Sequence, residues 1–145
     1  MSAIPDMIGF AVMTVSDSRD AKTDKTGPWL REQIAAEGHA VIDHAIVTDD
    51  IGAIQNRLQA WIADPAIHAV IATGGTGLTG RDVTPEAFKP LYDKEMDGFS
   101  AVYLFAIPGS MGGCKDVWNH ILKDEFDRTH RPCNLVDLLP RLTER

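Results

Sequence analysis

The chain has 145 residues, of which 44% are hydrophobic and 24% are charged, and this composition favours one folded domain over a disordered chain. Its net charge of −7 at pH 7 argues against a nucleic-acid partner, because the phosphate backbone would be repelled. No apolar run approaches the length of a membrane span, and the amino-terminal residues lack the features of a secretory signal. We therefore expect a cytoplasmic protein with no membrane partner, folded as a single domain over residues 1–145.

The first half of the chain predicts two strands with a helix between them. Residues 8–15 form a nearly continuous apolar run, which is typical of a buried strand. A helix is expected to open at Thr26, because Pro28 suits its first turn, and to end at Gly38, a residue type common after helices. Residues 40–47 are the second expected strand.

Two strands and three helices are expected along the rest of the chain. Asp49 and Asp50 can cap one helix, and Thr84 can cap another. Residues 69–73 and 103–107 are short apolar strands. The apolar stripes of the helices that follow Asp50 and Ser110 are, in order, Ile51, Ile54, Leu58, Trp61 and Ile62, and Cys114, Val117, Trp118, Ile121, Leu122 and Phe126.

Alternation of strands and helices predicts a three-layer α/β/α domain with a mostly parallel sheet. In such folds ligands bind beyond the carboxyl ends of the strands. The polar and glycine-rich segments 16–20, 48–50, 74–82 and 108–113 each follow a predicted strand. We therefore expect these four segments to meet at one edge of the sheet, which we call the rim.

The strongest local motif is the segment from Gly74 to Asp82. Four of its first seven residues are glycines, with Thr76 and Thr79 between them. Glycines let the backbone turn sharply and point amides at a ligand, and the start of the following helix adds partial positive charge. The segment suits a phosphate or a carbonyl-rich heterocycle, and the alternative is a tight turn without a ligand.

The spacing of Gly75 and Gly80 also fits the outer glycines of a P-loop. In that motif a lysine and then a serine or threonine follow, for the phosphates and for Mg²⁺. Arg81 and Asp82 occupy these two positions here. A P-loop-like phosphohydrolase is therefore disfavoured.

Two aspartates are candidate metal ligands at the rim. Asp49 and Asp82 open segments that follow two different predicted strands. Two carboxylates at such a place can hold Mg²⁺ and bridge it to phosphate oxygens. The alternative is that each aspartate only caps a helix.

The remaining polar and sulfur-containing residues carry weaker signals. Residues 16–19 offer two hydroxyls and the cation of Arg19 to the rim, although a solvated loop is the default interpretation of such a segment. Cys114 and Cys133 form neither a Cys-X-X-Cys pair nor a zinc-like cluster with the histidines. We interpret both as buried or idle thiols.

Several of these motifs resemble the MoaB/Mog family of molybdenum cofactor biosynthesis proteins, over nearly the whole chain. The matching residues are Val15, Ser16, Asp17, Asp49, residues 73–77, residues 81–86, Pro108, Gly109 and Ser110. The glycine-rich motif is long and specific. Residues 130–134, His-Arg-Pro-Cys-Asn, resemble the MoaB branch rather than the Mog branch.

The resemblance implies a molybdopterin-binding α/β fold that assembles as a homo-oligomer, a trimer or hexamer. It implies that ATP and Mg²⁺ are used to adenylylate molybdopterin with release of pyrophosphate. Asp49 and Asp82 would be catalytic and hold Mg²⁺. The pterin- and nucleotide-binding residues would be Ser16, Asp17, Gly74, Gly75, Thr76, Gly77, Arg81, Pro108, Gly109 and Ser110. The alternative function is a non-catalytic pterin-binding or scaffold protein of the same pathway.

The chain departs from the family pattern before its last strand. Residues 97–102 run directly into Tyr103, where family members carry a further helix and strand. Surfaces left bare by this difference should be apolar. We therefore expect contacts between subunits, trimer-based by the resemblance, to cover part of the sheet.

Overall fold

The computed structural model describes residues 7–74, 87, 102–127 and 129. Its sheet has four parallel strands in the order β2-β1-β3-β4. The strands are β1 (Gly9–Val15), β2 (Ala40–Val47), β3 (Ala69–Thr73) and β4 (Tyr103–Ile107). All four predicted strands are confirmed, because short apolar runs bounded by polar or glycine residues leave little freedom in their limits.

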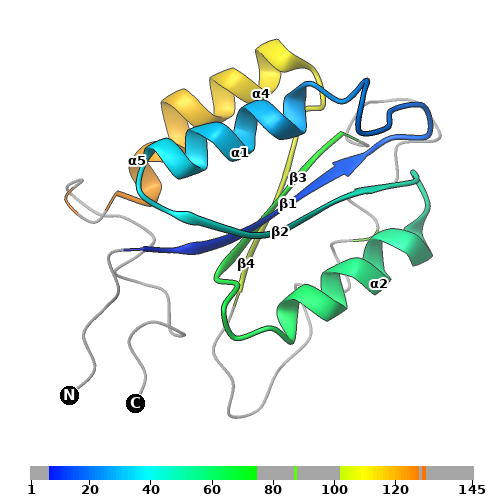
Figure 1. Ribbon diagram of the computed structural model, residues 1–145, viewed down its shortest axis with the longest axis horizontal. Helices are drawn as coiled ribbons and strands as arrows, with labels where there is room; N and C mark the ends of the chain where they lie inside the picture. Colours follow the sequence, from blue (N-terminus) through cyan, green and yellow to red (C-terminus); the bar gives the residue numbers. More distant parts are fainter. Residues whose placement is uncertain (1–6, 75–86, 88–101, 128, 130–145) are drawn as a thin grey trace.

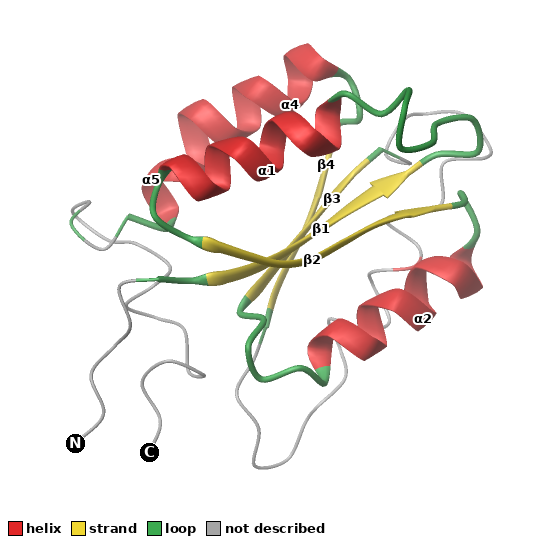
Figure 2. Ribbon diagram, viewed as in Figure 1, coloured by secondary structure: helices red, strands yellow, loops and turns green. Residues whose placement is uncertain are grey.

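Helices cover both faces of the sheet. Figures 1 and 2 show α1 (Thr26–Ala36) and the final helical segment on one face and α2 (Ile51–Ile62) on the other. The final segment consists of α4 (Met111–Val117), the π-helical turn η1 (Trp118–Leu122) and α5 (Lys123–Glu125). The predicted three-layer α/β/α architecture is confirmed. None of the helices in the described ranges is long and apolar enough to cross a membrane.

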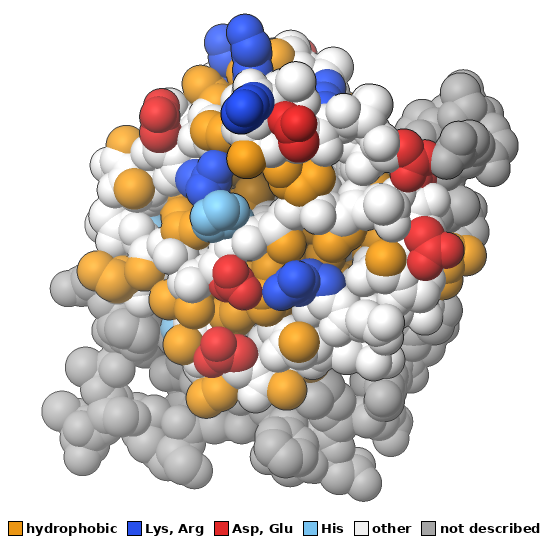
Figure 3. Space-filling view, turned by 45° about the vertical axis from the view of Figure 1, so that its right-hand side comes forward, with side chains coloured by type: hydrophobic (Ala, Val, Ile, Leu, Met, Phe, Trp, Pro, Cys, Tyr) orange, Lys and Arg blue, Asp and Glu red, His pale blue; other side chains and the backbone are white. Residues whose placement is uncertain are grey.

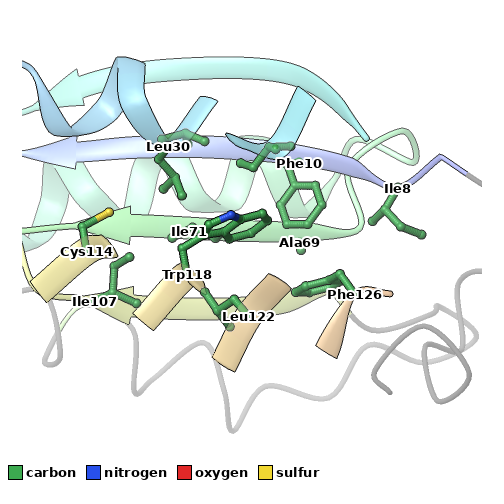
Figure 4. Packing of buried hydrophobic residues seen from close by; sticks show 12 residues of the cluster. Ile8, Phe10, Leu30, Ala69, Ile71, Ile107, Cys114, Trp118, Leu122 and Phe126 are labelled. Atoms are coloured by element: carbon green, nitrogen blue, oxygen red, sulfur yellow. The ribbon is translucent and has the colours of Figure 1, made fainter. Parts of the chain in front are cut away.

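The hydrophobic core has two parts, one on each side of the sheet, because successive strand residues face opposite sides. Every residue of β1 is buried. Phe10 packs on the side of α1 and α4, whereas Met13 packs on the side of α2. Figure 4 shows the first part, where the ring centroids of Phe10 and Phe126 lie 4.9 Å apart next to Trp118. The expected placement of Trp61 and Trp118 in the core is confirmed.

The expected apolar stripe of the last helix is wrong at one position. Ile121 is 55% exposed, whereas Trp118, Leu122 and Phe126 are buried. The π-helical turn between Trp118 and Leu122 explains the difference. Hydrogen bonds between residues five apart make a π-helical turn wider than an α-helical turn. Residues four apart, such as Trp118 and Leu122, then lie on the same face of the helix, and Ile121 is rotated toward solvent.

Two histidines hold the start of β1 at the amino edge of the sheet. The N–H of Ile8 donates to Nδ1 of His39 at 3.3 Å, and the N–H of Gly9 donates to Nδ1 of His68 at 2.9 Å. An imidazole nitrogen accepts such a bond only while it carries no proton. Burial lowers the pKa of His39 below its ordinary value of 6.5. Folding therefore favours the neutral form of His39.

We expect the free energy of unfolding to fall as the pH is lowered from about 7.5 to about 5.5. The unfolded chain binds a proton at His39 near the ordinary pKa of 6.5, whereas the folded chain binds it only at lower pH. Urea unfolding at several pH values measures this slope. The variant His39→Asn should have a smaller slope, and the same change at the exposed His120 should leave it unaltered. Equal slopes in all three proteins would contradict the assignment.

Candidate functional site

The carboxyl ends of all four strands lie at one edge of the sheet. In the sheet register Val15 is opposite Val47, and Thr73 is opposite both Thr14 and Ile107. Segments 16–20 and 48–50, Gly74 and the turn at residues 108–110 therefore begin side by side, as expected of the rim. The other predicted rim residues, Gly75, Thr76, Gly77, Arg81 and Asp82, lie outside the described residues.

Two glycines let the rim segments approach each other at the backbone. Gly74 has a φ of +96°, and a Cβ atom added to it would collide with the carbonyl oxygen of Val15. A Cβ atom on Gly109 would lie 2.8 Å from the Cα atom of Gly74. The N–H of Gly74 donates to the carbonyl oxygen of Ile107 at 3.1 Å. The segments after β1, β3 and β4 are thus packed together without side chains between them.

The carbonyl oxygen of Gly109 receives two hydrogen bonds from the segment between β1 and α1. Nη1 of Arg19 donates to it at 3.2 Å, and the hydroxyl of Thr26 donates at 3.1 Å. Arg19 is half-buried, so the expectation of a solvated loop is wrong at this residue. Sequence reasoning missed Thr26 as a rim residue, because a bond to a distant backbone carbonyl leaves no local pattern.

The two predicted serines of the rim organise their own segments. The hydroxyl oxygen of Ser16 accepts from the N–H groups of Ser18 and Arg19, at 3.2 and 3.0 Å. The hydroxyl oxygen of Ser110 accepts from the N–H of Gly113 at 3.1 Å and so caps α4. Both serines therefore fix the course of the backbone at the rim.

Two predicted acidic residues are neighbours at the rim. A carboxylate oxygen of Asp17 accepts from the N–H of Asp49 at 3.0 Å. The cap of α2 is the adjacent Asp50, whose carboxylate accepts from the N–H of Ala53 at 2.9 Å. The helix-cap alternative for Asp49 is therefore wrong.

The acidic side chains at the rim are candidate ligands for a magnesium ion. No group of three or more His, Cys, Asp or Glu side chains suited to a metal occurs among the residues that the structure covers. Mg²⁺ in nucleotide sites is usually held by one or two carboxylates together with substrate phosphates and water. The hydrogen bond between them places Asp17 and Asp49 next to each other at the rim, and together they offer two carboxylates, the number that such a site uses.

A layer of buried polar side chains lies between the rim and the core. In the described ranges the buried polar residues are Thr14, Asp24, Thr26 and Thr73. The hydroxyl of Thr14 donates to Asp24 at 2.8 Å, and the N–H of Gly27 donates to the other carboxylate oxygen at 3.2 Å. Asp24 thereby joins the end of β1 to the start of α1. The only sequence signal for this layer is a threonine near the end of two otherwise apolar strands.

We expect Thr73→Val to raise the free energy of unfolding by about 1 kcal/mol. The hydroxyl of Thr73 is fully buried and has no hydrogen-bond partner within the described structure, and valine has almost the same shape. Thr14→Val is the matched control at the paired position of β1, because it removes a partner of Asp24 and should destabilise the fold. Urea unfolding of both variants tests this, and a destabilised Thr73→Val would contradict it.

The only cysteine in the described part of the chain lies in the hydrophobic core. Cys114 is free and buried, and burial raises the pKa of its thiol to about 11. The group stays protonated at neutral pH, and the prediction of a buried thiol is confirmed at Cys114. Cys133 lies outside the described residues.

Comparison with known proteins gives consistent matches. A family model described as a probable molybdopterin binding domain matches residues 11–104. The molybdenum cofactor biosynthesis protein B of Escherichia coli strain K12 is 36% identical over 150 residues, covering 86% of this chain and 88% of that protein. A crystal structure of a molybdenum cofactor biosynthesis protein B is 30% identical with a TM-score of 0.74, covering 86% and 93% of the two chains. The MoaB structure from Thermus thermophilus is 26% identical with a TM-score of 0.68, covering 81% and 91%.

The alignment with the Escherichia coli protein also measures a difference in length. It spans 150 positions but covers 86% of the 145 residues of this chain, which is about 125 residues. About 25 aligned positions of the relative therefore have no counterpart here. This number of residues is large enough for the further helix and strand that the family pattern places before Tyr103. The N–H of Tyr103 nevertheless donates to the carbonyl oxygen of His68 at 3.1 Å, so β4 still joins the sheet.

Proposed function

The chain belongs to the MoaB/Mog family of molybdenum cofactor biosynthesis proteins, and from this premise we propose that it acts in that pathway by binding molybdopterin at the rim. The observation that carries the proposal is the backbone contact between Gly74 and Gly109. It holds the segments after β3 and β4 side by side with no side chain between them, so that backbone groups rather than side chains face a ligand at this point of the rim, which suits the recognition of a phosphate group.

We further propose that the bound pterin is adenylylated with ATP. An oxygen of the terminal phosphate of the pterin attacks the α-phosphorus of ATP, and the bond from that phosphorus to the bridging oxygen breaks. Pyrophosphate leaves with the electron pair of the broken bond. No nucleophilic side chain is needed, so the contribution of the protein is to hold and align the two phosphates.

The acidic pair of the rim supports this reaction. Asp17 and Asp49 would hold Mg²⁺ together with the phosphates, and Asp82, which lies outside the described residues, is proposed as a further ligand. A bound Mg²⁺ supplies positive charge that offsets the charge of the triphosphate. The carboxylates themselves fix where that charge lies relative to the backbone of the rim.

The experiment is incubation of the protein with molybdopterin, ATP and MgCl₂, with adenylylated pterin and pyrophosphate measured together. We expect both products in equal amounts, and neither when Mg²⁺ is removed by a chelator. Binding of molybdopterin is measured separately by fluorescence. Pyrophosphate released without adenylylated pterin would contradict adenylyl transfer.

One observation favours a second candidate, pterin binding without catalysis. About 25 positions of the Escherichia coli relative have no counterpart in this chain. The resemblance implies that the corresponding segment contributes residues near the pterin. Binding of molybdopterin with no formation of either product would support this candidate and exclude the catalytic one.

We also propose that the chain assembles as a homo-oligomer, trimer-based, through the edge of the sheet at β4. Tyr103, Leu104 and Phe105 are only half-buried there, although β4 pairs with the fully buried β3. Covering this apolar edge would stabilise an assembly. Light scattering should give a multiple of three times the 15.9 kDa of one chain. A monomer at all concentrations would contradict the proposal.

A further inference from the structure

Arg19 has no carboxylate partner among the residues that the structure describes. It is half-buried in the segment between β1 and α1, and Nη1 donates its hydrogen bond to the carbonyl oxygen of Gly109. The one ion pair found in the described residues joins Arg57 and Asp43, far from this segment in the sequence. The guanidinium group has five N–H donors, so it can bind a further partner while the bond to Gly109 is kept.

Arg19 is a half-buried cation in a protein whose net charge is negative. The net charge of the chain is −7, and Figure 3 shows basic side chains interspersed with acidic ones on the face turned to the viewer. Lys22 of the same segment is exposed, so its charge is hydrated. A half-buried cation has lost part of its hydration, and an anion that replaces the lost water is bound more strongly than at an exposed lysine.

The bond to Gly109 also fixes where Arg19 lies. The same carbonyl oxygen is held by the hydroxyl of Thr26, which is buried, so the acceptor itself has little freedom. The guanidinium group is therefore kept next to the turn at residues 108–110. A fixed, planar guanidinium matches the oxygens of a phosphate group in pairs.

We propose that Arg19 is a ligand-binding residue of the rim and that it binds a phosphate group next to the turn at residues 108–110. The inference rests on the proposed function, because the phosphate of a pterin or nucleotide is then its partner. Arg19 also fixes the position of the turn through its hydrogen bond to Gly109. Its positive charge contributes to binding in addition to this positioning.

The test separates the charge of Arg19 from its hold on the turn. Inorganic pyrophosphate is titrated into isotope-labelled protein, and dissociation constants are obtained from amide shifts of Gly109 and Ser110 and from the side-chain Nε–H signal of Arg19. Arg19→Gln should raise the dissociation constant about tenfold or more, because a charge-assisted bond is lost. Arg19→Lys should lie between the parent and Arg19→Gln.

Two matched variants serve as controls. Thr26→Val removes the other bond to the same carbonyl oxygen and leaves the cation in place, so the dissociation constant should rise only about twofold. Lys22→Gln removes one charge from an exposed position of the same segment and should have a similarly small effect. A loss in Thr26→Val equal to that in Arg19→Gln would reduce Arg19 to a residue that only positions the turn, and would overturn the proposal.

Three further outcomes of these titrations bear on the proposal. An equal loss in Lys22→Gln would assign the effect to net charge, and a parent protein whose Arg19 signal does not respond to pyrophosphate would likewise overturn the proposal. Molybdopterin is titrated in parallel. If the parent binds pyrophosphate through Arg19 but does not bind molybdopterin, the proposed function fails and the anion site stands.

Discussion

Replacing Gly109 by alanine should weaken the binding of molybdopterin at the rim about tenfold or more, since overpacking at a tight contact typically costs about 1–3 kcal/mol. The added Cβ atom would lie 2.8 Å from the Cα atom and 3.2 Å from the nitrogen of Gly74. Both are backbone atoms, so the clash is relieved only by moving the segments after β3 and β4 apart. This movement would also stretch the bonds from Arg19 and Thr26.

The control for this prediction is the same substitution three residues further on. Nothing lies within 4 Å of a Cβ atom added to Gly112, which is inside α4. Gly112→Ala should therefore leave binding unchanged and raise the free energy of unfolding by about 0.5–1 kcal/mol, since alanine is the better helix former. Fluorescence titration and urea unfolding of both variants provide the measurements. Equal affinity of Gly109→Ala and the parent would show that the ligand does not need the contact with Gly74.

Replacing Asp49 by asparagine should slow adenylyl transfer about a hundredfold or more, a usual loss when a charge-stabilising group is removed from a site of this kind. Asparagine keeps the size of the side chain, and the N–H of residue 49 can still donate to Asp17. The affinity for molybdopterin alone should change little, because the carboxylate is proposed to act on the nucleotide through Mg²⁺.

A variant of the neighbouring Asp50 separates an effect on the reaction from an effect on the stability of α2. Asp50→Ala removes the cap of α2 and should lower the free energy of unfolding by about 1 kcal/mol while turnover is retained. Release of pyrophosphate under saturating ATP and MgCl₂ is the measurement. If Asp49→Asn turns over at the rate of the parent, Asp49 has no part in the reaction.

The sequence allowed the sheet to be predicted almost completely because its signals are local. Each strand is a short apolar run, and the parallel order follows from alternation with helices. The same reasoning located the rim, since the ends of parallel strands meet at one edge. It failed at Ile121, because a π-helical turn changes which residues share a face without changing the composition.

The contacts inside the site could not be predicted, because they depend on groups that are distant in the sequence. Gly109 lies 90 residues from Arg19 and 83 from Thr26, and the shared acceptor is a backbone oxygen that every residue possesses. The sequence also gives no sign that the hydroxyl of Thr73 lacks a hydrogen-bond partner within the described structure, because the rest of the strand is apolar. Asp50 rather than Asp49 caps α2, a choice between adjacent aspartates that only geometry decides.

The central claim, that the rim binds molybdopterin, is tested most directly by titrating the pterin into isotope-labelled protein and following the backbone amide signals. We predict saturable shifts at Gly74, Asp49, Gly109 and Ser110, and none at Ile8 and Gly9, which lie at the opposite edge of the sheet beside His39 and His68. Saturable shifts confined to that opposite edge, or no saturable shifts at all, would contradict it.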